Sequence, residues 1–196
     1  MDEVAFYRSA RDKTIKDFES WRSKPYICGA GVPTIGYGTT RYPDGRAVTM
    51  QDPEITLEQG EQYYNNDIQK IETTLRGVDG FNDMSLAQQA GLTSFAYNVG
   101  TGPFTQPTGY ETFQTAFKSG DTNQMADAMD LYINKGTKNE AGLRRRRTAE
   151  RGLMNLEYVP EVPTKPGAGV YTMSQKAQPK AAPVRKAGDA FKTGRW

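Results

Sequence analysis

The chain has 196 residues, a formal net charge of +2 and 36% hydrophobic residues, which suits one domain with a tail or two small domains. Histidine is absent and cysteine occurs once, so a Ser-His-Asp triad, a Cys-His pair and an internal disulfide are excluded, and the usual catalytic zinc site lacks its ligands. If the chain is a hydrolase, carboxylates or the thiol must transfer its protons, and we expect it to need no metal or cofactor.

The first predicted element is an amphipathic helix from Asp2 to about Trp21, in which apolar residues recur at helical spacing. Pro25 ends this helix, and Glu19 lies in its last turn. The first residues are charged and hold no apolar run like that of a secretion signal, so we expect synthesis in a cytoplasm. No segment approaches the roughly 20 apolar residues of a membrane-spanning helix, so we expect no transmembrane segment.

Two short β-prone segments follow at residues 32–40 and 46–50, separated by Arg-Tyr-Pro-Asp-Gly at 41–45. A Pro-Asp-Gly cluster between such segments predicts a hairpin. Gly36 and Gly38 alternate with larger residues, so one face of the first strand is bare backbone that a ligand can approach closely.

The chain is then predicted to be helical. Two pairs of residues have the spacing of a capping box, which marks the start of a helix. They are Thr56 with Gln59 and Ser85 with Gln88. The helix after Ser85 is apolar on most sides, so we predict that it is the central buried helix. Three further helices, bounded by glycine or polar caps, are predicted at 110–121, 123–136 and 141–158.

The last residues differ in composition from the rest. From Glu157 onward the chain has 7 Lys and Arg against 3 Asp and Glu, and it is rich in Pro, Ala and Gly. Such a segment buries too little apolar surface to offset the entropy of ordering. We therefore predict a domain at residues 1–157 and a basic, largely disordered tail at 158–196. The tail is either a solvated end or a segment attracted to anionic wall polymers or a membrane surface.

The junction between the first helix and the hairpin is the candidate site. Phe18, Trp21 and Tyr26 partly desolvate Glu19 in this interpretation, and desolvation favours the protonated form of a carboxyl, as a general acid requires. Thr34 begins the strand and can hold a water molecule through its hydroxyl. The predicted cleft is open and suits a polymer better than a small metabolite. The alternative is that Glu19 is a solvated or ion-paired acid at a helix end.

Three segments resemble the phage-type lysozymes, the endolysins of tailed bacteriophages. They are "FESWRSKPYICGAGVPTIGYGTT" at 18–40, "LTSFAYNVGTGPF" at 92–104 and "GLRRRRTAERGLM" at 142–154, in the order of the family. The resemblance covers about Asp12 to Leu156. It implies an α+β fold, with a small lobe that carries the hairpin, a larger and mainly helical lobe, and a cleft between them.

The resemblance also implies a muramidase that hydrolyses the β-1,4 bond between N-acetylmuramic acid and N-acetylglucosamine in peptidoglycan, and so lyses the host cell. Glu19 takes the place of the family's general acid, and Thr34 takes the place of the residue that helps to position water. Cys28 stands where the best-known members carry Asp, although Cys also occurs there. The implied substrate-binding residues are Gly38, Thr40, Tyr97 and Asn98. For Tyr97 and Asn98, packing and helix capping is an equally open interpretation.

Several alternatives stay open for the thiol. Cys28 can act as a base toward water, stabilise a cationic sugar electrostatically or attack it as a nucleophile. It can also be a small buried apolar residue, as free cysteines usually are. A second departure from the family is Gly-Thr-Thr at 38–40, where the pattern often reads Gly-His-Thr. This leaves the role of that histidine without a counterpart.

The run Arg144 to Arg147 has the composition of a nucleic-acid patch. Successive residues are about 100° apart around a helix, so the four do not form one stripe. Glu150 is spaced to pair with Arg146 or Arg147. We therefore expect mostly solvated ion pairs and no nucleic-acid partner. As the family's last helix allows, we expect one arginine, Arg145, to face Glu19.

Two rival functions remain. A lytic transglycosylase cleaves the same bond without water, and a binding protein with this fold binds the wall or nucleic acid without cleaving. The expected partner is the peptidoglycan glycan strand, and we expect a monomer. We also expect the protein to wait in the cytoplasm of an infected cell until a holin lesion opens, or to be carried in the virion.

Overall fold

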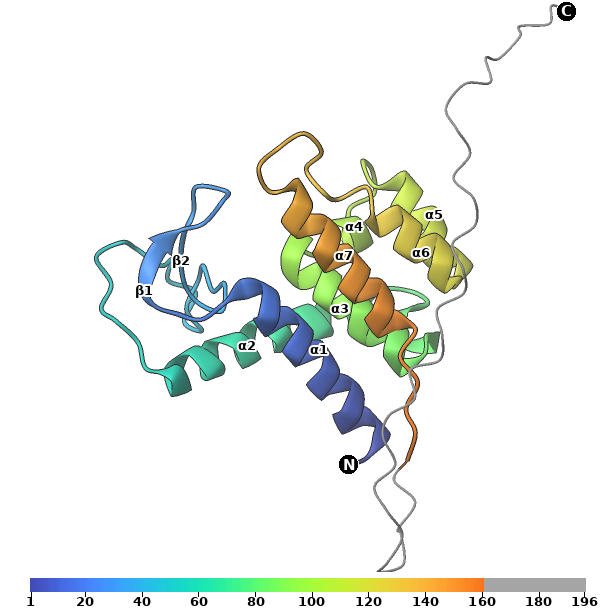
Figure 1. The fold of residues 1–196 in the computed structure, drawn as a ribbon, viewed down its shortest axis with the longest axis horizontal. Helices are drawn as coiled ribbons and strands as arrows, with labels where there is room; N and C mark the ends of the chain where they lie inside the picture. Colours follow the sequence, from blue (N-terminus) through green and yellow to red (C-terminus); the bar gives the residue numbers. More distant parts are fainter. Residues whose placement is uncertain (161–196) are drawn as a thin grey trace, which may run out of the picture. The chain divides into compact units, whose positions relative to one another are not determined.

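The computed structural model describes residues 1–160, so the predicted tail lies outside the described residues from position 161 onward. Within this range the chain forms a small lobe with a β-hairpin and a larger helical lobe (Figure 1). The elements are α1 (Glu3–Glu19), β1 (Arg22–Ile27), β2 (Pro33–Gly36), α2 (Leu57–Arg76), η1 (Phe81–Asp83), α3 (Leu86–Val99), α4 (Gly102–Thr105), α5 (Glu111–Ser119), α6 (Thr122–Met129) and α7 (Glu140–Met154).

Each lobe has its own core, and this arrangement confirms the predicted α+β fold. The small lobe is built around Ile35, Tyr42, Val48 and Ile55. The large lobe is built around a cluster of aromatic, aliphatic and methionine side chains contributed by α2 to α7. Between the lobes, α2 runs from the hairpin toward the helices (Figure 1). The first turn of α2 packs closely on the small lobe, because a Cβ on Gly60 would lie 2.1 Å from the Trp21 ring.

The helix predicted to be central is α3, and it is buried on most sides. Eight of its 14 residues are buried, although its first turn begins at the surface. Both predicted capping boxes are present, at Thr56 with Gln59 and at Ser85 with Gln88. Helix α7 lies directly on α3, because a Cβ on Gly91 would lie 2.2 Å from Met154. This contact brings the arginines of α7 to the junction of the lobes.

The hairpin was predicted only in part. The turn at 41–45 is present, with Arg41 bridged to Ala47 and Gly45 N–H donating to the Tyr42 carbonyl over 2.9 Å. The main sheet, however, is β1 paired antiparallel with β2. The prediction missed β1 because Pro25 was interpreted only as the end of a helix. The pairing shifts register between Arg22 and Tyr26, and a proline is tolerated at such an irregularity in an edge strand.

Helix α1 ends at Glu19, earlier than predicted, because Ser20 adopts a φ of 57°.

Hydrogen bonds hold the two ends of the described chain together. Tyr158, the first residue of the predicted tail, donates its hydroxyl to the Met1 carbonyl over 2.7 Å. Its backbone N–H donates to the hydroxyl of Tyr7 over 3.1 Å. Among residues 1–160 no helix is long and apolar enough to cross a membrane.

Candidate active site

Glu19 is the last residue of α1, and its side chain is 20% exposed. The carboxylate lies against the backbone of Gly38, where a Cβ would be 3.1 Å from Oε2. Gly38 also has a φ of +103°, which side chains disfavour. The position therefore requires glycine for two reasons, its backbone conformation and the approach of the acid.

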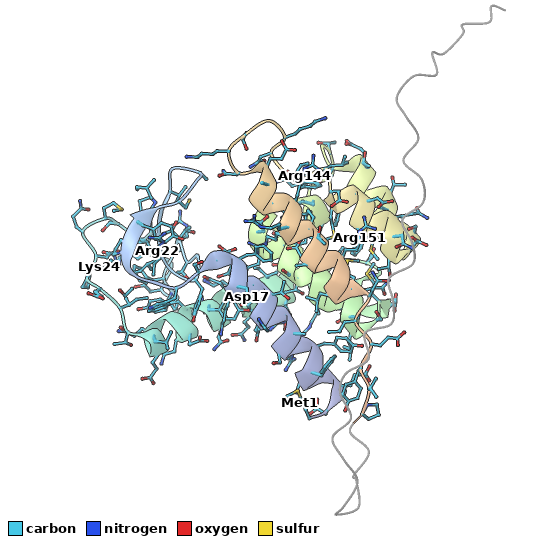
Figure 2. The ribbon with its side chains drawn as sticks, viewed as in Figure 1. Met1, Asp17, Arg22, Lys24, Arg144 and Arg151 are labelled. Carbon is cyan, nitrogen blue, oxygen red and sulfur yellow. The ribbon has the colours of Figure 1, made fainter. Side chains whose placement is uncertain are left out.

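The arginine that faces Glu19 is Arg146, so the prediction of Arg145 was wrong. Arg146 Nη1 donates to Glu19 Oε1, and the arginine side chain is only 5% exposed. Arg145 is exposed and forms no ion pair within residues 1–160. Arg144, which is labelled in Figure 2, is also exposed, and it pairs with Glu140 at the start of α7. The two halves of the arginine run thus have opposite surroundings.

A buried charge network continues from Arg146 into the large lobe. Arg146 Nε donates to Glu150 Oε1 over 3.1 Å, and Arg147 Nη1 donates to Glu150 Oε2 over 2.6 Å. The Ser94 hydroxyl of α3 donates to Glu150 Oε1 over 3.1 Å. Glu150 and Arg147 have fully buried side chains. The expectation of mostly solvated ion pairs was therefore wrong for this half of the run.

Cys28 lies at the tip of the hairpin and is partly exposed. Its N–H donates to the Val32 carbonyl over 3.0 Å, and its carbonyl accepts from Gly31 N–H, which closes a tight turn. Across the tip, a Cβ on Gly29 would lie 3.3 Å from the side chain of Asn139, so the hairpin approaches the start of α7. Partial exposure at a loop tip does not fit the alternative of a buried apolar cysteine.

Hydrogen bonds hold the pKa of the Cys28 thiol below its ordinary value. Partial desolvation acts to raise this pKa, but hydrogen bonds from Thr34 and from the backbone near Val32 outweigh it. Thr34 is almost fully buried, and its hydroxyl donates to the Val32 carbonyl over 2.9 Å. A hydroxyl has one proton, so Thr34 can serve either Val32 or a thiolate at Cys28, but not both at once.

Tyr26 is a candidate site residue that the sequence interpretation treated only as a neighbour of Glu19. It stands opposite Thr34 in the sheet, and the Arg22 guanidinium lies 4.9 Å from its ring centre. Burial raises the pKa of Tyr26, and the nearby charges of Glu19 and Cys28 raise it further. Tyr26 therefore lies within electrostatic range of both predicted catalytic side chains.

The predicted substrate-binding residues have different surroundings. The Tyr97 hydroxyl donates to the Tyr37 carbonyl over 2.7 Å, and burial raises the pKa of Tyr97. Asn98 accepts a hydrogen bond from Arg147, which can only donate, so its amide nitrogen is turned away from that arginine. Thr40 is exposed, and its carbonyl accepts from Val48 N–H over 2.9 Å. Contact of these residues with a sugar stays a prediction.

Thr39 stands where the family pattern often has histidine, and it contacts a partly buried acid. Its hydroxyl donates to Asp67 Oδ2 over 2.8 Å. Burial raises the pKa of Asp67, and the hydrogen bond from Thr39 only partly offsets this. No group of three or more His, Cys, Asp or Glu side chains that could hold a metal ion occurs in the part of the chain that the structure describes.

The sequence held a signal that distinguishes the arginines. One face of α7 carries the apolar residues Leu143, Leu153 and Met154, because 153 and 154 follow 143 by about three helical turns. Residues 146 and 147 continue that face, whereas 144 and 145 fall outside it. The apolar phase of α7 therefore predicts which arginines are buried.

Comparison with known proteins gives one consistent family. The family model described as phage lysozyme matches residues 16–150. An endolysin from Acyrthosiphon pisum secondary endosymbiont phage 1 is 30% identical over 139 residues, which are 71% of this chain and 90% of that protein.

Solved structures agree with this match. The structure of an endolysin from Escherichia coli O157:H7 phage FAHEc1 aligns with a TM-score of 0.63 and 30% identity, covering 79% of this chain and 95% of that one. The muramidase domain of SpmX from Asticaccaulis excentricus aligns with a TM-score of 0.59 and 25% identity, covering 76% of this chain and 97% of that one.

Proposed function

The chain belongs to the phage lysozyme family, and from this membership we propose that it is an endolysin-type muramidase. Its substrate is the glycan strand of bacterial peptidoglycan. The bond that it hydrolyses is the β-1,4 bond from N-acetylmuramic acid to N-acetylglucosamine. The names of two similar proteins, an endolysin and a muramidase domain, support this class of reaction.

The setting of Glu19 is the observation that carries the proposal. Its carboxyl is partly exposed, one oxygen is held by Arg146, and the other lies against the bare backbone of Gly38. A carboxyl held at a junction of two lobes can donate a proton to a bound glycosidic oxygen. In the proposed reaction Glu19 protonates that oxygen, the bond from it to the anomeric carbon breaks, and a water molecule replaces the leaving sugar.

Cys28 acts on that water molecule. Its lowered thiol pKa increases the thiolate fraction, and a thiolate can accept a proton from water as the second carboxylate does in an inverting glycosidase. The Thr34 hydroxyl helps to hold the water and can donate its one hydrogen bond to the thiolate. At the end of the reaction the water proton is on Cys28, and Glu19 is ionised. Return of one proton to Glu19 and loss of one from Cys28 restore the enzyme.

Four further residues are proposed to contact the glycan. Gly38 presents bare backbone next to Glu19, and Thr40 is an exposed residue two positions further along the chain. Asn98 presents its amide nitrogen as a donor, because its oxygen is engaged by Arg147. Tyr97 packs against Gly38, since a Cβ at that glycine would lie 3.6 Å from the tyrosine ring.

Loss of turbidity of purified sacculi tests the proposal. Glu19→Gln removes the proton donor, and Asp17→Asn is the matched control, because Asp17 lies on the same helix with a side chain that is 60% exposed (Figure 2). General acid catalysis contributes about 10²–10⁴-fold, so Glu19→Gln should lose at least about 10²-fold while Asp17→Asn stays near wild type. Equal, measurable rates for wild type and Glu19→Gln would refute Glu19 as the general acid, and no loss of turbidity with either protein would leave only the binding alternative.

Mass spectrometry of the digest separates the two enzymatic alternatives. A muramidase leaves reducing N-acetylmuramic acid ends, whereas a lytic transglycosylase leaves 1,6-anhydro ends and uses no water. We also propose that the protein acts at the end of an infection cycle, from the host cytoplasm through a holin lesion, or from the virion. Fractionation of infected cells and of purified virions distinguishes these two routes.

A further inference from the structure

We propose that Glu150 is a positioning residue for catalysis. Glu150 is a second, buried carboxylate on the guanidinium of Arg146. It thereby weakens the preference that Arg146 gives to the ionised form of Glu19. The inference rests on the proposed role of Glu19 as general acid. It assigns a function to a carboxylate that cannot reach the substrate, because its side chain is fully buried.

The geometry shows one cation shared between two acids. Arg146 donates to Glu19 through Nη1 and to Glu150 through Nε, the latter over 3.1 Å. The Arg146 side chain is 5% exposed, so water screens these contacts little. Glu150 in turn accepts from Arg147 over 2.6 Å and from Ser94 over 3.1 Å. Glu19 and Glu150 therefore compete for one buried positive charge.

The charged and polar groups around the two acids come from α1, β1, α3 and α7, together with Asp130 at the end of α6. Glu19 on α1 is faced by Arg146 from α7, Tyr97 from α3 and Tyr26 from β1. Glu150 is faced by the two arginines of its own helix and by Ser94 of α3. Arg147 is faced by Glu150, Arg146 and, at longer range, Asp130. The Arg147 guanidinium also lies 4.7 Å from the ring centre of Phe95.

A general acid beside an arginine faces two opposed requirements. The arginine fixes the carboxyl in place, but a nearby positive charge favours the ionised form, which cannot donate a proton. A second carboxylate on the same guanidinium cancels part of that charge and leaves the hydrogen bond intact. Glu150 supplies such a carboxylate: burial raises its pKa, but the charges of Arg147 and Arg146 and the hydrogen bond from Ser94 act against that rise and favour its ionised form. Arg146 can then orient Glu19 without keeping it ionised.

Removal of Glu150 and removal of Arg147 should shift the titration midpoint of Glu19 in opposite directions. In Glu150→Gln the charge of Arg146 acts on Glu19 alone, so the titration midpoint of Glu19 falls. In Arg147→Gln the cluster loses a cation and Glu150 draws more strongly on Arg146, so the midpoint of Glu19 rises. Loss of packing alone has no reason to move the midpoint in opposite directions in the two variants.

The test is a pH titration of the side-chain carboxyl carbon of Glu19 by ¹³C NMR in the full chain, assigned by its absence in Glu19→Gln. We expect Glu150→Gln to lower the midpoint by about one pH unit, which is a tenfold smaller protonated fraction above the midpoint. We expect Arg147→Gln to raise it, and Glu150→Asp, which keeps the charge, to restore the wild-type midpoint. If one of these variants fails to fold, the direction of the Glu19 midpoint shift in the other, compared with wild type and Glu150→Asp, still tests the inference.

Unchanged midpoints, or shifts in the same direction in Glu150→Gln and Arg147→Gln, overturn the inference. The titration needs no substrate, so its outcome is separate from that of the proposed function. If Glu19→Gln digests sacculi as fast as wild type, the general-acid proposal fails whatever the titrations show. If Glu19→Gln is inactive and the midpoints do not move, only the role of Glu150 fails.

Discussion

Replacement of Gly38 by alanine should damage activity more than stability. The new Cβ would lie 3.1 Å from Glu19 Oε2, a distance that forces the carboxylate to move by a few tenths of an ångström. The φ of +103° adds strain, because an unfavourable backbone conformation costs about 1–3 kcal/mol. For a domain of this size that cost lowers Tm by roughly 3–10 °C.

Gly45→Ala is the matched control for this experiment. Gly45 has a φ of +88°, and a Cβ there would have nothing within 4 Å. It should therefore show a similar loss of Tm, measured by thermal unfolding, with near-normal digestion of sacculi. A misplacement of about 1 Å in a catalytic group can cost about 10²-fold, so we expect roughly a tenfold loss in Gly38→Ala from the smaller shift. Equal activities in folded Gly38→Ala and Gly45→Ala would refute the contact between Gly38 and Glu19.

Three further results are expected. The chain has one cysteine, so the pH dependence of its alkylation reports Cys28 alone, with a midpoint below the ordinary 9.0 that Thr34→Val moves upward. Cys28→Asp should digest sacculi, whereas Cys28→Ala should lose most activity; full activity in Cys28→Ala would leave the thiol no catalytic role. Burial raises the pKa of Asp67 above its ordinary 3.8, so its ionisation costs folding free energy as pH rises through the folded-state pKa. Asp67→Asn should therefore raise Tm at pH 7, with a gain that shrinks as pH falls toward 3.8, and an equal gain at both pH values would contradict this reasoning.

Much of the fold could be predicted because local chemistry and tertiary structure agree. The capping boxes at Thr56 and Ser85 mark helix starts that the structure keeps. The apolar surface of α3 predicted burial on most sides. Strand β1 could not be found in this way, because it is short, contains Pro25 and is stabilised by its pairing with β2 rather than by its own pattern. The short helices η1 and α4 likewise have too few residues for a periodic signal.

The site was predicted less completely than the fold. Glu19, Cys28 and Thr34 were nominated from motifs, and the structure places Cys28 next to Thr34. Which arginine pairs with Glu19 depends on how α7 is rotated about its axis against α3. A run of four arginines does not by itself reveal that rotation. Burial of Glu150 is a tertiary effect, since the same spacing on an exposed helix gives an ordinary surface pair.

The most direct test of the central claim is the release of reducing N-acetylmuramic acid ends from purified sacculi by wild type and Glu19→Gln. The account predicts steady release by wild type and a loss of at least about 10²-fold in a Glu19→Gln protein that keeps the wild-type Tm within a few degrees. Release at the wild-type rate by Glu19→Gln, or 1,6-anhydro ends from wild type, would contradict it.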